Sequence, residues 1–220
     1  MLVVVGSPSA RLEGGDVRAD GIAAGVAQAA VAAGGSVQIV GRVGEDPLGD
    51  GVLLDLAAAG VGHVAVLRAA GEATPLALPP SGRADDAAPG EALAGDATFD
   101  PPSPMPAAGL RLDAADLELA LRYLPDYRVI VAAADLDPAA LTSVVAAASW
   151  SGARLVVLVG GDPGTPNLPP DATVLAQPAD ADEAFSAVVA RYAVELDRGS
   201  EPAAAFAAAS SGAGWQTVES

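Results

Sequence analysis

Short apolar runs alternate along the chain with longer segments in which apolar residues recur every three or four positions. The first run, Leu2–Val5, is mostly β-branched and ends at Gly6, which is typical of a buried parallel strand. Further runs of this kind predict strands at 37–40, 129–133, 155–159 and 173–175. Helical spacing and end signals predict helices at 21–33, 47–59, 113–124, 139–150, 180–196 and 202–210.

The predicted helices have recognisable ends. Asp46-Pro47 and Asp137-Pro138 each place an N-cap acid before a proline at the first helical position, and Asp113 is a further N-cap candidate. Gly34-Gly35 is a typical signal for the end of the preceding helix. Alternating strands and helices predict a single α/β domain over residues 1–220, with a mostly parallel sheet sandwiched by helices.

Two segments depart from this alternation. Residues 63–68 and 74–78 are short strand candidates joined by a four-residue turn, which predicts a hairpin at one edge of the sheet. Residues 79–108 are rich in Pro, Gly and Ala and have few large apolar side chains, which predicts a long loop within the domain.

Composition restricts the partners and the cellular location. The chain has 28 acidic and 11 basic residues and a formal net charge of −17, so nucleic acid and anionic membranes are not expected partners. No apolar run reaches the ~18 residues of a membrane-spanning helix. The absence of cysteine rules out disulfides and thiolate chemistry, and together these features favour a cytoplasmic protein.

Two further absences narrow the chemistry. Every basic residue is arginine, and without lysine the chain cannot form a Walker-type phosphate loop or a Schiff base. The only histidine is His63, so a catalytic triad or multi-histidine metal site would depend on it alone. At the start of a predicted strand, His63 is expected to be a simple turn residue. No metal site is predicted.

The segment Val40–Asp50, VGRVGEDPLGD, resembles the ribokinase-type (PfkB) carbohydrate kinases, in which a V-G-x-V-G-x-D-x-x-G run links a core strand to the next helix. The following Leu56–Val61 matches the family's Leu-x-x-x-G-V pattern. The similarity extends over about two-thirds of the chain and implies a shortened, degenerate member with a ribokinase-like fold. Its lid would be reduced to residues 7–20 and 65–78.

The resemblance also implies ATP-dependent phosphorylation of a sugar or nucleoside hydroxyl. Such a reaction needs a base and backbone N–H groups that stabilise the transferring charge, and the family supplies both in a G-A-G-D motif. The corresponding segment here is DADEAF, with Asp180 and Asp182 in place of the glycines and Glu183 in place of the base. Acids at a helix N-terminus suit the helix dipole but repel phosphate.

Two other assignments of this motif remain open. Residues 177–185 also align with the family's N-x-x-E-A stretch, in which case the nucleotide half is missing. Gly212-Ala213-Gly214 mimics the glycines of the motif, but too few residues follow it to form a helix, which indicates a tail. No convincing nucleotide or anion site is therefore predicted.

The sugar end of the family pattern is also altered. The family's early aspartate falls within Ser9–Arg11, where there is no acid, and its G-G-x-G-x-N motif maps onto 20–25 without the asparagine. Gly21, Gly25 and Gly41 are the remaining substrate-binding candidates. Helix packing also accounts for Gly21 and Gly25 without a ligand.

These losses favour a ribokinase-like protein without sugar-kinase catalysis that acts as a binding, regulatory or scaffold module and needs no cofactor. The alternative is an ATP-dependent carbohydrate or nucleoside kinase with Glu183 as base and Asp162 or Asp135 assisting Mg²⁺. An unrelated Rossmann-like protein is a third interpretation, which the missing G-x-G-x-x-G disfavours. The partners implied are a small sugar or nucleoside and a second copy, since family members often pair through their lids.

Overall fold

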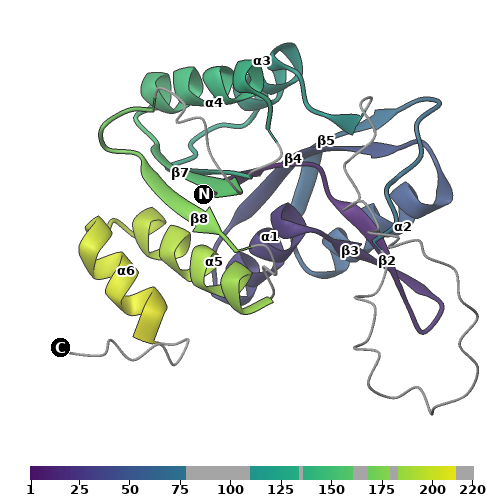
Figure 1. Cartoon of the computed structure of the whole chain (residues 1–220), viewed down its shortest axis with the longest axis horizontal. Coiled ribbons are helices and arrows are strands. Elements are labelled where there is room, and N and C mark those ends of the chain that lie inside the picture. The colour runs from purple at the N-terminus through teal and green to yellow at the C-terminus, as the bar shows by residue number, and fades with distance from the viewer. Residues whose placement is uncertain (78–109, 134–135, 161–167, 179–182, 212–220) are drawn as a thin grey trace, which may run out of the picture.

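The protein folds into three layers, with one parallel sheet between two layers of helices (Figure 1). This arrangement comes from a computed structural model, which describes residues 1–77, 110–133, 136–160, 168–178 and 183–211. The central sheet has six strands in the order β5-β4-β1-β6-β7-β8. Their bounds are β1 Leu2–Val5, β4 Val37–Gly44, β5 Gly62–Ala69, β6 Val129–Ala132, β7 Arg154–Gly160 and β8 Thr173–Gln177. The predicted mostly parallel α/β sheet is confirmed.

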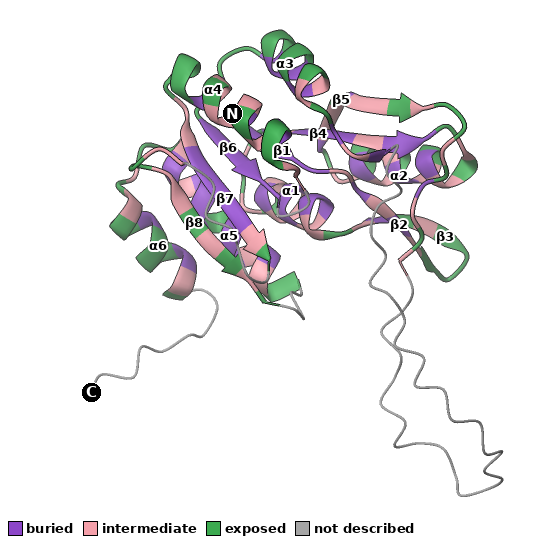
Figure 2. Cartoon of the chain, turned by 45° about the horizontal axis from the view of Figure 1, so that its top comes forward, coloured by how far each residue is buried: buried purple, intermediate pink, exposed green. Residues whose placement is uncertain are grey.

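The apolar runs form the middle of the sheet because both of their faces are covered. Every residue of β1 and β6 is buried (Figure 2). Alternate side chains of β1 point to opposite faces, so Leu2 and Val4 belong to one apolar cluster, and Val3 and Val5 to the other.

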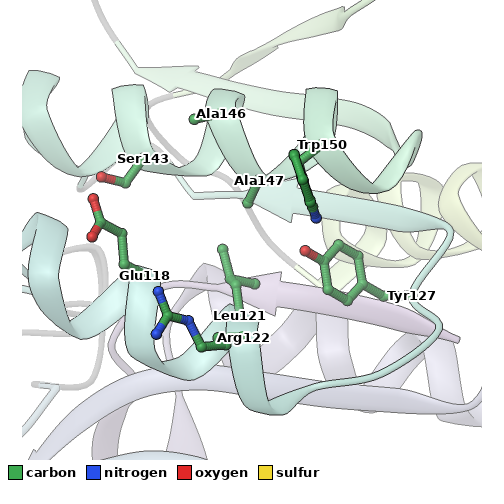
Figure 3. A pocket seen from close by; sticks show the side chains of 8 residues that line it. All are labelled: Glu118, Leu121, Arg122, Tyr127, Ser143, Ala146, Ala147 and Trp150. Carbon is green, nitrogen blue, oxygen red and sulfur yellow. The ribbon is translucent and has the colours of Figure 1, made fainter.

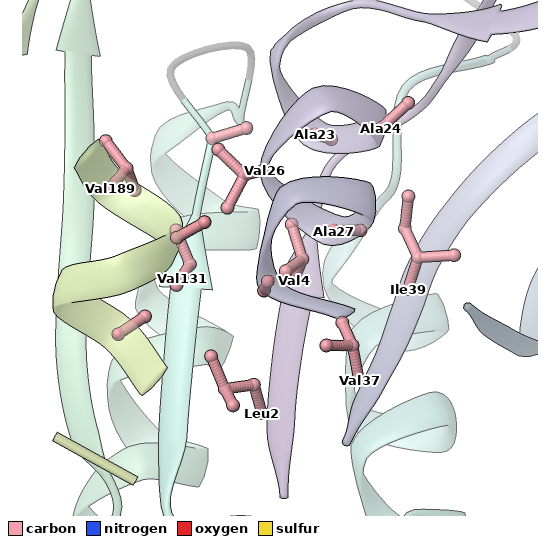
Figure 4. Packing of buried hydrophobic residues seen from close by; sticks show 14 of the residues in the cluster. Leu2, Val4, Ala23, Ala24, Val26, Ala27, Val37, Ile39, Val131 and Val189 are labelled. Atoms are coloured by element: carbon pink, nitrogen blue, oxygen red, sulfur yellow. The ribbon is translucent and has the colours of Figure 1, made fainter. Parts of the chain in front are cut away.

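Helices cover both faces of the sheet. One face packs against α1, α2 and α5, with α6 lying on α5, and the other packs against α3 and α4. Figure 4 shows how Ala23, Ala24 and Ala27 of α1 lie close to the strands, as expected for a helix of small side chains. The helices are α1 Ile22–Ala32, α2 Pro47–Ala58, α3 Ala114–Tyr123, α4 Pro138–Ser151, α5 Glu183–Asp197 and α6 Pro202–Ser211.

The predicted helix starts are confirmed by hydrogen bonds from backbone N–H groups to the capping side chains, and the predicted end of α1 by its backbone geometry. Asp46, Asp113 and Asp137 each accept a hydrogen bond from the backbone N–H three residues later. Gly34 has a φ of 82°, which favours glycine after the end of α1. These ends were predictable because each depends on residues that are close in sequence.

The predicted hairpin of residues 63–68 and 74–78 is wrong, and with it the second half of the predicted lid. Residues 62–69 form β5, which pairs in parallel with β4 as an edge strand of the main sheet. Leu76 instead forms an isolated parallel bridge with Ala10. Ala10 belongs to β2 Ser9–Glu13, which forms an antiparallel hairpin with β3 Asp16–Asp20. The lid of the described residues is therefore this hairpin with the segment beside it. The long loop predicted at residues 79–108 lies outside the described residues.

The connections define one edge of the sheet where a site is expected. The chain passes from β1 to β4 on one side, and after β5 it crosses back to β6 on the other side of β1. In open α/β sheets, ligands bind at the carboxyl ends of the strands beside such a reversal. Among the helices that the structure describes, none is long and apolar enough to cross a membrane.

Candidate functional site

The candidate site lies at the carboxyl edge of the sheet, beside β1. The helices α1 and α5 both begin at this edge, because each follows a strand or hairpin that ends there and runs back across the sheet. They lie side by side on the same face, where they share one apolar cluster (Figure 1). The structure thus brings together two stretches that are more than a hundred residues apart in the sequence.

Three of the predicted site residues lie where these two helices begin. Gly21 precedes α1, Gly25 lies one turn into it, and Glu183 is exposed in the first turn of α5. A Cβ atom on Gly25 would lie 2.9 Å from Oγ of Ser186, so glycine lets α1 and α5 approach closely here. The juxtaposition of Gly21, Gly25 and Glu183 agrees with a shared site, while their role in binding stays a prediction.

Gly41, the fourth predicted site residue, lies in β4 directly beneath the chain that leaves β1. A Cβ atom at this position would lie 2.6 Å from the carbonyl oxygen of Gly6 and 3.0 Å from Cδ of Pro8. Only glycine allows this close backbone approach. Gly41 therefore acts on the site by positioning the Gly6–Pro8 segment, and a direct contact between Gly41 and a ligand remains untested.

The rest of the Val40–Asp50 motif forms a compact polar network around Thr74. The Thr74 hydroxyl donates to Oδ1 of Asp46 at 2.8 Å and accepts from the backbone N–H of Gly44 at 2.9 Å. The Thr74 backbone N–H donates to Oδ2 of Asp46 at 2.7 Å, and Gly49 donates to Oδ1 at the same distance. The motif thus fastens the segment after β5 to the start of α2.

The Asp46 carboxylate is stabilised in its charged form by this network. Partial burial raises the pKa of Asp46, but the hydrogen bonds from Gly49 and Thr74 and the nearby Arg68 guanidinium together hold that pKa below its ordinary value. Neither Gly44 nor Gly49 has room for a side chain. A Cβ atom on Gly44 would meet the carbonyl oxygen of Glu72, and one on Gly49 would meet the carbonyl oxygen of Gly44. These residues have a structural role.

A second carboxylate anchors the lid hairpin. Asp55 of α2 accepts hydrogen bonds from the Arg18 guanidinium at 2.9 Å, the Ala19 backbone at 2.9 Å and the Gln28 amide at 3.0 Å. Burial raises the pKa of Asp55, but these three donors outweigh it and lower the pKa. Because Gln28 belongs to α1, a single side chain connects the hairpin, α1 and α2.

Ser7 connects the end of β1 to α3 on the other face. Its hydroxyl donates to the carbonyl oxygen of Leu110 at 2.7 Å and accepts from the backbone N–H of Arg42 at 3.1 Å. The Arg42 guanidinium forms an ion pair with Asp116 in the first turn of α3. Sequence reasoning missed these links because Ser7 and Arg42 carry no motif that identifies their partners.

Two buried polar atoms at the hairpin and the carboxyl edge were also missed. Nε of Arg11 in β2 and Oε1 of Gln177 at the end of β8 are buried and have no hydrogen-bond partner among the described residues. Arg11 lies on the same face of the hairpin as Ser9, whose Oγ is 3.4 Å from where a Cβ atom on Gly21 would lie. Arg11 therefore presents a donor near the start of α1, within the Ser9–Arg11 stretch where the family carries an acid.

Several predicted residues lie outside the described part of the chain: Asp135, Asp162, Asp180, Asp182 and residues 212–214. Within the described part, no group of three or more His, Asp or Glu side chains is placed to hold a metal ion. His63 is the second residue of β5, with Nδ1 3.2 Å from the carbonyl oxygen of Val61.

Two surface hollows lie away from the carboxyl edge. One, of about 440 Å³, is a groove between α3 and α4 (Figure 3). The other, of about 390 Å³, lies between the end of α4 and the start of β7, at the amino edge of the sheet. Neither hollow is lined by Gly21, Gly25, Gly41 or Glu183.

Comparison with known proteins identifies the fold. No protein-family model matches the chain, and no curated protein sequence matches it. Among solved structures, Arabidopsis thaliana ribokinase complexed with ribose and ATP is similar with a TM-score of 0.62 at 16% identity, over 96% of this chain and 90% of that chain. A PfkB protein from Polaromonas is similar with a TM-score of 0.62 at 18% identity, over 96% and 94%. The predicted ribokinase-like fold is confirmed.

Proposed function

We propose that this chain, which has the ribokinase-like fold, is a non-catalytic module that binds a small sugar or nucleoside at the carboxyl edge of its sheet. The observation that carries the proposal is the pairing of α1 and α5 at that edge, with Gly25 against Ser186 and Glu183 in the first turn of α5. A helix start that carries an acid disfavours the charged phosphates of a phosphoryl transfer. A neutral polyhydroxyl ligand is not repelled in this way.

Donors near the start of α1 support such a ligand. Gly21 precedes α1 without a side-chain cap, so the first backbone N–H groups of this helix have no partner from that residue. The unpaired Nε–H of Arg11 lies on the hairpin face that turns toward the same helix start. Hydroxyl and ring oxygens of a sugar accept hydrogen bonds from such donors without carrying charge.

Thermal unfolding with a ligand panel tests this proposal. ATP with Mg²⁺ and ADP should leave the melting temperature unchanged, while one sugar or nucleoside should raise it, because a ligand that binds only the folded state stabilises it. Arg11→Ala should abolish that rise, whereas Arg191→Ala, at an exposed position on α5, should retain it. A panel without any response would contradict the proposed binding role.

The alternative, a kinase with Glu183 as base, makes the opposite prediction. It is favoured by one observation, namely that Glu183 is exposed beside the start of α1. ATP with Mg²⁺ would then raise the melting temperature and a sugar or nucleoside would be phosphorylated. Loss of both effects in Glu183→Gln, with Glu201→Gln at an exposed position before α6 as the matched control, would overturn the non-catalytic proposal.

A further inference from the structure

The outer face of α4 differs from most of this acidic protein because it carries no charge. Its 14 residues, PAALTSVVAAASWS, include no Asp, Glu or Arg, although 18% of the whole chain is charged. Its exposed positions are Pro, Ala, Thr or Ser, apart from Trp150, which is 93% exposed. A neutral helix face that ends in an exposed tryptophan is typical of a protein contact, where Trp, Tyr and Arg are enriched.

The groove between α3 and α4 gives this face a definite shape. Its floor contains Leu121 and Tyr127, which are buried. Figure 3 shows Trp150 beside Tyr127 at one end of the groove, and Ser143 beside Glu118 at the other end. Ala146 lies between these two ends, on the α4 side. The exposed Trp150 and the Ser143–Glu118 end of the groove thus lie at different positions along α4 (Figure 3).

The charge of the protein indicates what binds there. A basic partner would be attracted to the acidic surfaces and would gain nothing from an uncharged one. A second copy of this chain carries the same net charge of −17 and is repelled by every acidic face. For such a partner, the absence of charge on α4 removes a cost that the acidic parts of the surface impose.

We propose that two copies of this chain pair through α4, with the helices antiparallel about a two-fold axis near Ala146. Such an interface is self-complementary: if a residue of one copy contacts a different residue of the other, the same contact also forms with the two copies exchanged. Each Trp150 then enters the Ser143–Glu118 end of the other copy's groove, where its indole N–H can donate to the Glu118 carboxylate. The small residues of α4 allow the two helix backbones to approach closely.

This surface is distinct from the lid that the family resemblance suggested for pairing. The hairpin of β2 and β3 is anchored to its own chain through Asp55 and carries Glu13, Asp16 and Asp20 on its two strands. Arg18 of the same hairpin already pairs with Glu13 and with Asp55 of its own chain. The helix α4 itself carries no charge and forms no ion pair of this kind.

Sedimentation velocity over a range of protein concentrations tests the pairing. We expect a monomer–dimer equilibrium that shifts toward dimer as salt is added, because salt screens the repulsion between two acidic copies. Trp150→Ala and Ala146→Glu should each abolish the dimer without unfolding, since both positions are exposed. A monomer at every concentration, or a dimer that withstands both substitutions, would overturn the proposal.

The helix α6 provides the matched control, because it also lacks charged residues and packs on α5, on the other side of the sheet from α4. Ala207 is exposed on α6, so Ala207→Glu should leave the dimer intact. The chain contains no cysteine, so single cysteines can locate the axis. Under oxidation, Ala146→Cys should form a disulfide-linked dimer and Ala207→Cys should not. Cross-linking of Ala207→Cys alone would place the interface on α6 and contradict the proposal.

Discussion

The two halves of the sheet are stabilised in different ways. Around β4 and β5, the carboxylates of Asp46 and Asp55 each accept three hydrogen bonds, and every donor except Gly49 is at least 27 residues away in the sequence. Around β6 and β7, packing is apolar, and the side-chain hydrogen bonds of α4 remain within its own helix and its N-cap Asp137. In the first half, side-chain hydrogen bonds connect different helices and strands. In the second half, apolar packing connects them.

This difference changes the meaning of the Val40–Asp50 motif. Its glycines and its aspartate hold the segment after β5 against α2, and Thr74 completes the network. The motif therefore indicates the fold because it holds the segment around Thr74 in place. The contacts described for its residues are structural.

The largest expected effect is the loss of the Asp46 carboxylate. Asp46→Ala leaves the Thr74 and Gly49 donors without an acceptor and should lower the free energy of unfolding by about 4 kcal/mol, because each hydrogen bond to a charged group contributes about 1.5–3 kcal/mol. Asp137→Ala removes a single N-cap bond and should cost about 1 kcal/mol. Urea unfolding measures both, and equal costs would contradict the contrast between the two halves.

A similar contrast is expected for two glycines. Gly44→Ala brings a Cβ atom against the backbone of residues 72–74, which cannot rotate away, so it should cost about 3 kcal/mol. Gly152→Ala, at the end of α4, meets no atom within 4 Å and should cost only the strain of a φ of 71°, about 1 kcal/mol. Chemical denaturation of the two variants checks this order, and a reversed order would refute it.

A smaller effect should appear as a dependence on pH. The folded-state pKa of Asp55 lies below its ordinary value of 3.8, so its stabilising effect is complete above that value and is lost as the pH falls through the folded-state pKa. The free energy of unfolding should fall on acidification more steeply in the wild type than in Asp55→Asn. Unfolding curves between about pH 6 and pH 3 measure this, and parallel pH profiles would rule it out.

The smallest effect is expected where α1 meets α5. The Cβ atom of Gly25→Ala would press on the Ser186 hydroxyl, which can rotate, so the cost should be about 1 kcal/mol or less. Ser186→Ala in the same chain should recover part of that loss by removing the oxygen. Thermal unfolding of the single and double variants measures the recovery. A double variant less stable than Gly25→Ala would show that the hydroxyl is not the limiting contact.

Much of the fold was predictable from local patterns. The five strands predicted from apolar runs all occur in the sheet, and the caps at Asp46, Asp113 and Asp137 lie where the sequence places them. The wrong prediction was the hairpin of residues 63–68 and 74–78. The short apolar pattern of 74–78 is compatible both with a hairpin to β5 and with pairing to β2. Thr74 joins Asp46 across 28 residues, and no local periodicity reports a contact of that range.

The sequence alone determined which segments are strands and helices, because periodicity and caps depend on neighbours a few residues away. It also excluded lysine, thiol and multi-histidine chemistry. Only the tertiary structure decided that Gly25 meets Ser186, that Asp55 connects three elements, and that α3 and α4 leave a groove beside Trp150. These contacts arise when distant segments pack on one sheet, and packing depends on side-chain shape across the whole core.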